Sequence, residues 1–253
     1  MCLLAFAWQV GGQPLTLLGN RDEFHARPTR EADFWNAEGH PDLLAGKDLE
    51  AGGTWLGVTR QARFATLTNI RAPGLRKGEL SRGSLVLDYL VSDQEPGSYL
   101  QALAEDNADF SPFNLLVGDH EQLWLYNSEE RQPRLLDPGI YALSNGQLDS
   151  DWPKQRKLRE QLADNLQSSP ESLLKLLEDS QVHADDQLPQ TGVSLEWERM
   201  LSAAFILGEE YGTRASSLLS INHHKEIHFV ERRFGPNGQA LGESGWDLLP
   251  SRG

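Results

Sequence analysis

The chain opens with two short apolar segments joined by a glycine pair, and this pattern predicts a β-hairpin at its very start. Apolar residues dominate positions 3–8, the sequence Gly11-Gly12-Gln13-Pro14 follows, and a second apolar run covers positions 15–19. Glycine and proline between two apolar runs are typical of a hairpin turn. The hairpin places the first two strands and so constrains the sheet that contains them.

The remaining pattern predicts strands at both ends of the chain with helices between them. This order indicates an α+β protein in which helices cover sheet layers. No internal repeat, linker or composition break divides the 253 residues, so a single domain over residues 1–253 is expected. Besides the hairpin, the expected strands are residues 54–59, 63–70, 114–117, 123–126, 140–143, 216–221 and 226–232, and the expected helices are residues 81–92, 99–104, 152–166, 170–178 and 195–204.

The composition argues against several classes of protein. The formal charge is -14, and residues 91–190 carry -12 of it, which we interpret as the solvated face of surface helices. A surface this negative repels phosphate backbones and anionic lipid, so no nucleic-acid partner is expected. No apolar run approaches the roughly 18 residues that span a bilayer, and the N-terminal stretch lacks the basic residues of a secretory signal. We therefore expect a cytoplasmic protein without a transmembrane segment.

No motif indicates a metal or a cofactor. The single cysteine excludes an internal disulfide and a cysteine-based zinc cluster. Of the seven histidines only His223, His224 and His228 lie close together in the sequence, and their spacing does not favour a metal site. The sequence has no phosphate-binding glycine motif.

Cys2 is the residue with the most informative chemistry. Removal of Met1 is normal before a small second residue, and it would leave Cys2 with both a thiol and a free α-amine. An α-amine has a pKa of about 7.7–8.0 and can act as a base near neutrality. One residue would then supply nucleophile and base together. The alternative is that Cys2 is a small, partly buried apolar residue at the start of a strand.

The predicted hairpin brings Cys2 beside a dense polar cluster. A four-residue loop pairs Cys2 with Glu23, and a shift of the loop by a residue or two places it beside Asp22 or Arg21 instead. A carboxylate there could hold the α-amine, and an arginine could lower the pKa of the thiol. Neighbouring strand residues point to opposite faces, so Asn20 shares a face with Asp22 but not with Arg21. The alternative is a solvated strand end with a capping aspartate.

These features occur together with other short motifs in a recognisable order. The motifs are Met1-Cys2, Asn20-Arg21-Asp22-Glu23, Gly52-Gly53-Thr54-Trp55-Leu56-Gly57, Thr68-Asn69, Phe113-Asn114-Leu115, Leu143-Ser144-Asn145 and Tyr211-Gly212-Thr213-Arg214. Together they resemble the transport and Golgi organisation protein 2 family, also called the N-R-D-E family, over nearly the whole chain. This resemblance implies the N-terminal-nucleophile hydrolase fold, a four-layer α-β-β-α sandwich.

A more distant resemblance points to cysteine N-terminal-nucleophile amidases such as bile-salt hydrolases and penicillin V acylases. It implies that the Cys2 thiolate attacks a carbonyl while Asp22 orients its α-amine. Asparagines would stabilise the oxyanion, and arginines would keep the site electropositive. The amidases separate their early arginine from the aspartate, whereas the two are adjacent here. The catalytic positions implied in this chain are Cys2, Arg21, Asp22, Asn69, Asn145 and Arg214.

Other residues are expected to bind the substrate. Asn20 and Glu23 complete the polar cluster, and Trp55, which lies between glycines, is the tryptophan expected to line a pocket. Arg71 begins a basic loop over residues 71–82, which would form a positive lip suited to a carboxylate or a coenzyme A thioester. A solvated surface loop is the alternative interpretation.

Two functions follow as hypotheses. The first is a hydrolase of the cysteine N-terminal-nucleophile type that acts on an amide or thioester of a small acyl compound. The second is a non-catalytic carrier or chaperone of haem or of acyl-coenzyme A or lipid on the same fold, since the family has been linked to both. A Cys2→Ala variant that keeps its activity would exclude the first hypothesis. The oligomeric state is not set by the sequence.

Overall fold

The computed structural model describes residues 2–74 and 78–250, which form two antiparallel sheets with helices on their outer faces. The first sheet contains β1 (Cys2–Val10), β2 (Gln13–Phe24), β10 (Gly139–Leu143), β11 (Tyr211–Ile221), β12 (Ile227–Phe234) and β13 (Ala240–Leu248), in the order β10-β1-β2-β11-β12-β13. The second contains β3 (Thr29–Trp35), β4 (His40–Asp48), β5 (Leu56–Thr59), β6 (Phe64–Asn69), β7 (Phe113–Gly118), β8 (Leu123–Asn127) and β9 (Gln132–Leu135), in sequence order.

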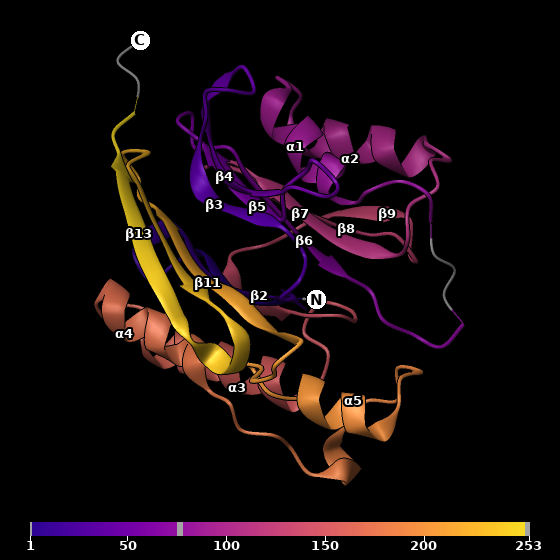
Figure 1. The fold of residues 1–253 in the computed structure, drawn as a ribbon. Coiled ribbons are helices and arrows are strands. Elements are labelled where there is room, and N and C mark those ends of the chain that lie inside the picture. The colour runs from indigo at the N-terminus through magenta and orange to yellow at the C-terminus, as the bar shows by residue number, and fades with distance from the viewer. Residues whose placement is uncertain (1, 75–77, 251–253) are drawn as a thin grey trace.

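Helices cover the outer face of each sheet (Figure 1). The second sheet carries α1 (Gly83–Val91) and α2 (Pro96–Glu105). The first sheet carries α3 (Pro153–Asp164) and α4 (Pro170–Lys175), and α5 (Leu195–Leu201) lies beside them; 3-10 turns occupy Leu176–Glu178, Asp185–Gln187 and Pro236–Gly238. The predicted four-layer α-β-β-α sandwich is therefore confirmed. Within the described ranges, every helix is too short or too polar to span a bilayer.

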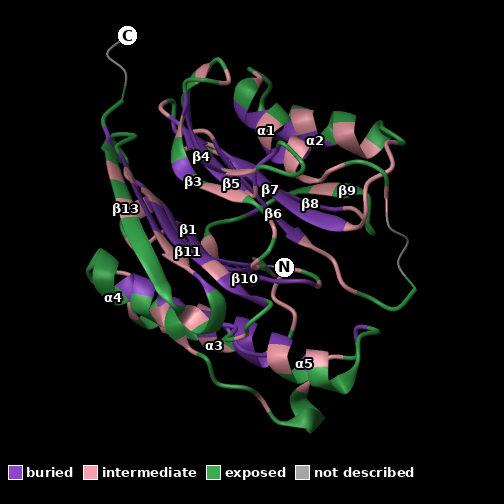
Figure 2. Ribbon diagram, in the orientation of Figure 1, coloured by how far each residue is buried: buried purple, intermediate pink, exposed green. Residues whose placement is uncertain are grey.

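The alternation of apolar residues in β1 explains why the layers form. Leu4, Phe6 and Trp8 point between the sheets, where they join the largest buried cluster. Leu3 and Ala5 point the other way and pack under α3 and α4. A strand that is buried on both faces reads as a continuous apolar run rather than as an alternating one. Figure 2 shows this burial, with buried residues along both sheets and exposed residues on the outer sides of the helices.

The turn of the N-terminal hairpin is tighter than the sequence analysis predicted. Gly11 and Gly12 form a two-residue turn with φ of 71° and 81°, and Val10 pairs with Gln13. Two-residue turns whose central residues both have positive φ match the twist of a hairpin, and glycine adopts them without strain. The register consequently places Cys2 opposite Arg21. The four-residue loop with Cys2 opposite Glu23 is wrong, and the alternative register shifted by two residues is the one observed.

Four strands lack a counterpart among the predicted elements: β3, β4, β9 and β13. β3 and β4 are rich in charged residues, and β9 and β13 are exposed edge strands, so none of them shows a clean alternation of apolar and polar residues. Of the predicted helices, the segment 170–178 is an α-helix followed by a 3-10 turn, and the segment 195–204 ends at Leu201.

Candidate active site

The register of three neighbouring strands brings the N-terminal motifs together. Cys2 on β1 pairs with Arg21 on β2, and Arg21 also pairs with Ala215 on β11. The β11 register shifts between Thr213 and Ala215, so Arg214 is the extra residue of a β-bulge. Bulges re-aim side chains at the ends of sheets. Here the bulge brings Arg214 to a cavity that Arg21 also lines.

The polar cluster at the end of β2 divides between the two faces of its sheet. The guanidinium of Arg21 lies 4.3 Å from the ring centre of Trp55, which immediately precedes β5 of the opposite sheet. Asn20 points to the helical side, where its Nδ2 donates to the carbonyl oxygens of Leu177 (2.9 Å) and Ala204 (2.8 Å). The prediction that alternate members of the cluster face opposite ways is therefore confirmed. Asn20 has a structural task on the helical side.

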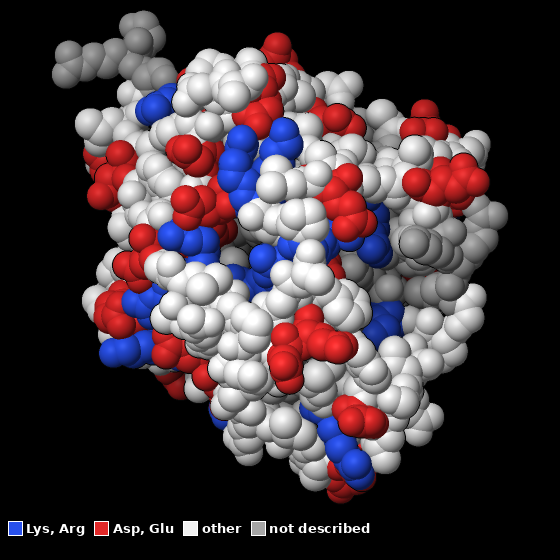
Figure 3. All heavy atoms as spheres, in the orientation of Figure 1, with Lys and Arg blue, Asp and Glu red and all other residues white. Residues whose placement is uncertain are grey.

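A cavity of about 330 Å³, here called the Cys2 cavity, lies at the mouth of the two sheets. Its wall brings together the predicted site residues Cys2, Arg21, Asp22, Glu23, Trp55 and Asn69. In the space-filling view, Lys and Arg side chains gather around a hollow between the two sheets on this face (Figure 3). Further residues that line the cavity are Arg27, Asp48, Glu50, Ala51, Thr54, Leu67, Gly78, Glu79, Leu80, Ser81, Arg82, Gly83 and Ser111.

Cys2 is held in a site that keeps its thiol protonated until a base acts on it. The residue is 7% exposed. Burial raises the pKa of the thiol, Asp22 and Glu23 raise it further, and the positive charge of Arg21 opposes them. Ser144 fixes the backbone by donating from Oγ to the carbonyl oxygen of Cys2 at 2.9 Å. Attack by this sulfur therefore requires a proton acceptor nearby.

Asp22 lies in a buried polar pocket that it shares with a lysine absent from the predicted site. Its Oδ1 accepts a hydrogen bond from the Oγ1 of Thr213 at 2.7 Å, and burial raises its pKa. Lys154, at the start of α3, is 4% exposed and donates from Nζ to the carbonyl oxygen of Leu201 at 2.8 Å. Burial lowers the pKa of Lys154 to about 8, and Asp22 opposes that shift. No sequence pattern marks Lys154 as a site residue, because it is one of several basic residues on a predicted helix.

The two asparagines of the predicted site are adjacent but differ in role. Asn69 ends β6 and lines the Cys2 cavity. Asn145 is 1% exposed and donates from Nδ2 to the carbonyl oxygen of Asn69 at 2.8 Å. The backbone of Arg71 in turn donates to the carbonyl oxygen of Asn145 at 2.8 Å. Asn145 therefore joins the segment after β10 to the end of β6 and fixes the backbone that carries Asn69.

The basic loop contributes a different arginine from the one predicted to bind substrate. Arg71 forms a buried ion pair with Glu198 of α5 at 3.1 Å, and Thr191 donates from both its backbone nitrogen and its Oγ1 to the same carboxylate. Arg82, at the other end of the loop, lines the Cys2 cavity and donates to the carbonyl oxygen of Pro112 at 3.1 Å. Residues 75–77 of this loop lie outside the described residues.

The glycine motif around Trp55 exists because backbones pack closely there. Gly52 has φ of +81°, a conformation that favours glycine. A Cβ on Gly53 would lie 2.3 Å from the carbonyl carbon of Gly83, at the start of α1. Gly46 of β4 leaves the space that the Trp55 ring fills, since a Cβ there would come within 2.3 Å of the ring. The motif thereby fixes the ring on which Arg21 stacks.

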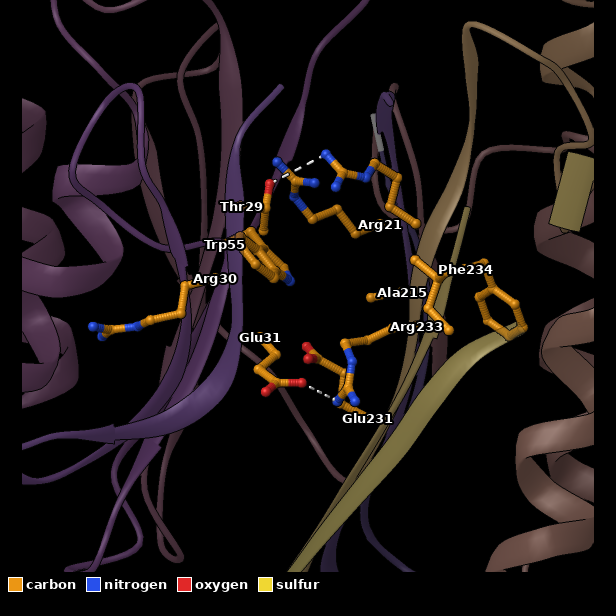
Figure 4. Close-up of a pocket in the computed structure, with 11 residues that line it drawn as sticks. Arg21, Thr29, Arg30, Glu31, Trp55, Ala215, Glu231, Arg233 and Phe234 are labelled. Atoms are coloured by element: carbon orange, nitrogen blue, oxygen red, sulfur yellow. Dashed lines mark hydrogen bonds and ion pairs between the residues drawn. The ribbon is translucent and has the colours of Figure 1, made fainter. Parts of the chain in front are cut away.

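A second cavity of about 350 Å³, here called the arginine cavity, lies on the other side of Arg21 and Trp55, which line both cavities. Arg214 lines this second cavity rather than the first. Figure 4 shows it between β3 on one side and the strands β11 to β13 on the other. Its remaining wall consists of Thr29, Arg30, Glu31, Ala215, Glu231, Arg233, Phe234 and Leu241.

Metal-ligating side chains do not gather at either cavity. Among the residues that the structure describes, no group of three or more His, Cys, Asp and Glu side chains is arranged to hold a metal ion. The acidic residues near Cys2 instead face arginines. Arg27, for example, donates to Asp48 at 2.7 Å and to Glu50 at 3.1 Å.

The comparison with protein families is decisive for the relationship of this chain. A family model described as "Transport and Golgi organisation 2" matches residues 1–236. The chain belongs to this family. Similar proteins include the Transport and Golgi organization protein 2 homologs of Bos taurus and Homo sapiens, 30% and 31% identical over 257 residues and 92% of each chain. The Transport and Golgi organization protein 2 of Drosophila melanogaster is 28% identical over 262 residues and 91% of each chain. The family resemblance inferred from the motifs is thus confirmed.

Solved structures with some similarity to this member of the family include two acyl hydrolases. One is a mutant conjugated bile acid hydrolase from Clostridium perfringens, with a TM-score of 0.49, 10% identity, and coverage of 98% of this chain and 92% of that chain. The other is a penicillin V acylase from Agrobacterium tumefaciens, with a TM-score of 0.44, 8% identity, and coverage of 90% and 82%.

Proposed function

We propose that this protein is a cytoplasmic hydrolase that uses Cys2 as an N-terminal nucleophile against the amide or thioester bond of a small acyl compound. The observation that carries the proposal is the placement of Cys2 in a cavity of about 330 Å³ together with Arg21 and Asn69. A cavity of this size suits a small ligand. A reduced cytoplasm keeps a lone thiol available for chemistry.

The proposed reaction begins once Met1 has been removed. The α-amine of Cys2 takes the thiol proton while the sulfur bonds to the substrate carbonyl carbon, whose oxygen becomes an oxyanion. The tetrahedral intermediate collapses, its bond to the amine or thiol leaving group breaks, and the leaving group takes the proton from the ammonium. Water then attacks the resulting thioester with the α-amine as base. This step releases the acid and restores the thiol.

The surrounding residues have defined tasks in this proposal. Asn69 lines the cavity and is the oxyanion donor, while Asn145 holds the Asn69 backbone in place. The Arg21 charge favours the thiolate over the thiol. Asp22 is the carboxylate that orients the α-amine, and its own hydrogen bond from Thr213 fixes its position. Burial works against the ionised thiol, so the amine is needed as the base.

The test compares the natural N-terminus with two altered ones. Intact mass should show loss of Met1, and the mature protein should hydrolyse 4-nitroanilides or N-acetylcysteamine thioesters of short acids through an acyl adduct detectable by mass. Cys2→Ala should abolish turnover. A control chain with a lysine inserted between Met1 and Cys2 keeps the thiol but blocks its amine, and it should also be inactive. Retained Met1, or turnover by either altered chain, would contradict the proposal. Haem or acyl-coenzyme A binding without turnover would favour the carrier hypothesis.

A further inference from the structure

The arginine cavity is a separate space with its own chemistry. Arg21 and Trp55, stacked at 4.3 Å, form the partition between it and the Cys2 cavity. The Nη2 of Arg21 lies 4.0 Å from carboxylate oxygens of Glu23 and Asp48, both of which line the Cys2 cavity. The Nη2 side of this guanidinium therefore faces the carboxylates of the Cys2 cavity. Its other terminal nitrogen, Nη1, is not part of these ion pairs.

Three arginines that line this cavity have buried nitrogens without a hydrogen-bond partner within residues 2–74 and 78–250. Nε and Nη2 of Arg30 belong to a side chain that points away from the cavity, which leaves Nη1 of Arg21, whose side chain is 7% exposed, and Nε of Arg214. The other side of the Arg214 guanidinium is occupied, because its Nη1 donates to the carbonyl oxygens of Phe24 and Arg27. Buried donors of charged groups are normally paired, and leaving one unpaired is costly. Two such donors beside one cavity would suit an anionic partner.

The other charges of this cavity are already balanced or weakened. Arg233 pairs with Glu31 at 2.8 Å, and Arg30 points away from the cavity toward Glu38, as Figure 4 shows for the Arg30 side chain. Glu231 is 2% exposed and accepts a hydrogen bond from the backbone nitrogen of Ala32 at 2.9 Å. Burial raises the pKa of Glu231, which reduces the repulsion it offers to an anion.

We propose that the arginine cavity is a second binding site that takes a small organic monocarboxylate. Its carboxylate would accept hydrogen bonds from Arg21 and Arg214, and its apolar part would lie against Trp55 and Leu241. Arg21 also faces Glu23 and Asp48, so the positive charge left for a ligand suits one negative charge better than two. A volume of about 350 Å³ fits an aromatic or short aliphatic acid. This site requires neither Cys2 nor the proposed hydrolysis.

The test uses three probes that share a ring but differ in charge: benzoate, phenyl phosphate and benzyl alcohol. Calorimetric titration should show that benzoate binds more tightly than phenyl phosphate and at least about tenfold more tightly than benzyl alcohol. Arg214→Gln should weaken benzoate binding about tenfold, whereas Arg134→Gln, a matched change at an exposed arginine of β9, should leave it unchanged. Cys2→Ala should also leave it unchanged.

A pair of charge variants tests the site without disturbing the core. Leu241 is 57% exposed at the rim of the cavity, so both variants should fold. Leu241→Lys should tighten benzoate binding, and Leu241→Glu should weaken it, each by about two- to fivefold at low salt. Equal binding of benzoate and benzyl alcohol would overturn the proposal. So would equal affinities of the two Leu241 variants, or loss of binding in Cys2→Ala, which would place the ligand in the Cys2 cavity.

Discussion

The two cavities on either side of Arg21 and Trp55 differ in chemistry although the same strands build them. The Cys2 cavity holds the thiol, an asparagine and several carboxylates that face arginines. The arginine cavity lacks the thiol, and among the described residues Nη1 of Arg21 and Nε of Arg214 are buried donors beside it without a hydrogen-bond partner. One partition therefore separates the site proposed for bond breaking from the site proposed for recognition.

Strand register and one bulge place an arginine at each of the two sites. Arg21 lies opposite Cys2 by strand register, and Arg214 reaches the neighbouring space because it is the extra residue of a bulge. A regular β11 strand would alternate its side chains across the sheet without this local change of direction. A single irregularity in pairing thus places Arg214, the last residue of the motif Tyr211-Gly212-Thr213-Arg214, at the arginine cavity.

The largest expected effect is a loss of turnover with no change in benzoate affinity. Asn69→Ala removes the proposed oxyanion donor from the Cys2 cavity and should lower turnover about 100-fold, because preorganised donors to a developing oxyanion contribute that much. Benzoate affinity for the arginine cavity should not change. Steady-state kinetics and titration on the same preparation give both values. A parallel loss of benzoate affinity would show that the two cavities act as one site.

A change beneath the partition should damage both cavities. In Gly46→Ala the new Cβ would meet the Trp55 ring at 2.3 Å, so the ring must move and Arg21 loses its platform. Overpacking of this kind costs about 1–3 kcal/mol in the free energy of unfolding. Urea unfolding measures that cost, and both turnover and benzoate affinity should fall together. The rim variant Leu241→Lys is the control, because it should alter benzoate affinity without lowering stability.

The partition also marks the limit of what the sequence predicts. Alternation in the hairpin correctly predicted that Asn20 and Arg21 face opposite ways, because strand geometry is local. The pairing of Cys2 was predicted only to within two residues, because the loop length decides it and Gly11-Gly12 closes the turn alone. The contact of Arg21 with Trp55 joins two sheets, and no local pattern predicts such a contact.

The basic loop over residues 71–82 is a second case in which the sequence does not predict which residue lines the cavity. The predicted positive lip was assigned to Arg71, but Arg71 forms a buried pair with Glu198, whereas Arg82 lines the Cys2 cavity. The sequence also does not predict that Lys154 is buried, because its burial depends on how α3 packs on the first sheet. Residue type predicted which kinds of side chain the site would need. Packing between distant segments determines which residue of each type lies at the cavity.

Removing the shared arginine should weaken both sites by a smaller factor than the changes above. Arg21→Gln withdraws a charge that lowers the pKa of the Cys2 thiol, so alkylation of the thiol by iodoacetamide near neutral pH should slow about tenfold. Benzoate affinity should fall by a similar factor, since one of two cationic partners is lost. Arg134→Gln serves as the exposed control. Slower alkylation with unchanged benzoate binding would leave Arg21 in the Cys2 cavity alone.

The smallest expected effect tests communication across the partition. Burial raises the pKa of the Cys2 thiol, so the thiolate fraction and the alkylation rate should both rise as the pH increases through that pKa. Benzoate beside Arg21 would offset part of the positive charge that favours the thiolate, and this raises the thiol pKa further. Alkylation should then slow about two- to threefold below the pKa and not at all above it, where the thiol is ionised in either case.

Intact-mass time courses across the pH range measure the rates, with benzyl alcohol as the uncharged control. Slowing by the same factor at every pH would mean that benzoate blocks the reagent from within the Cys2 cavity, and the two cavities would then have to be treated as one.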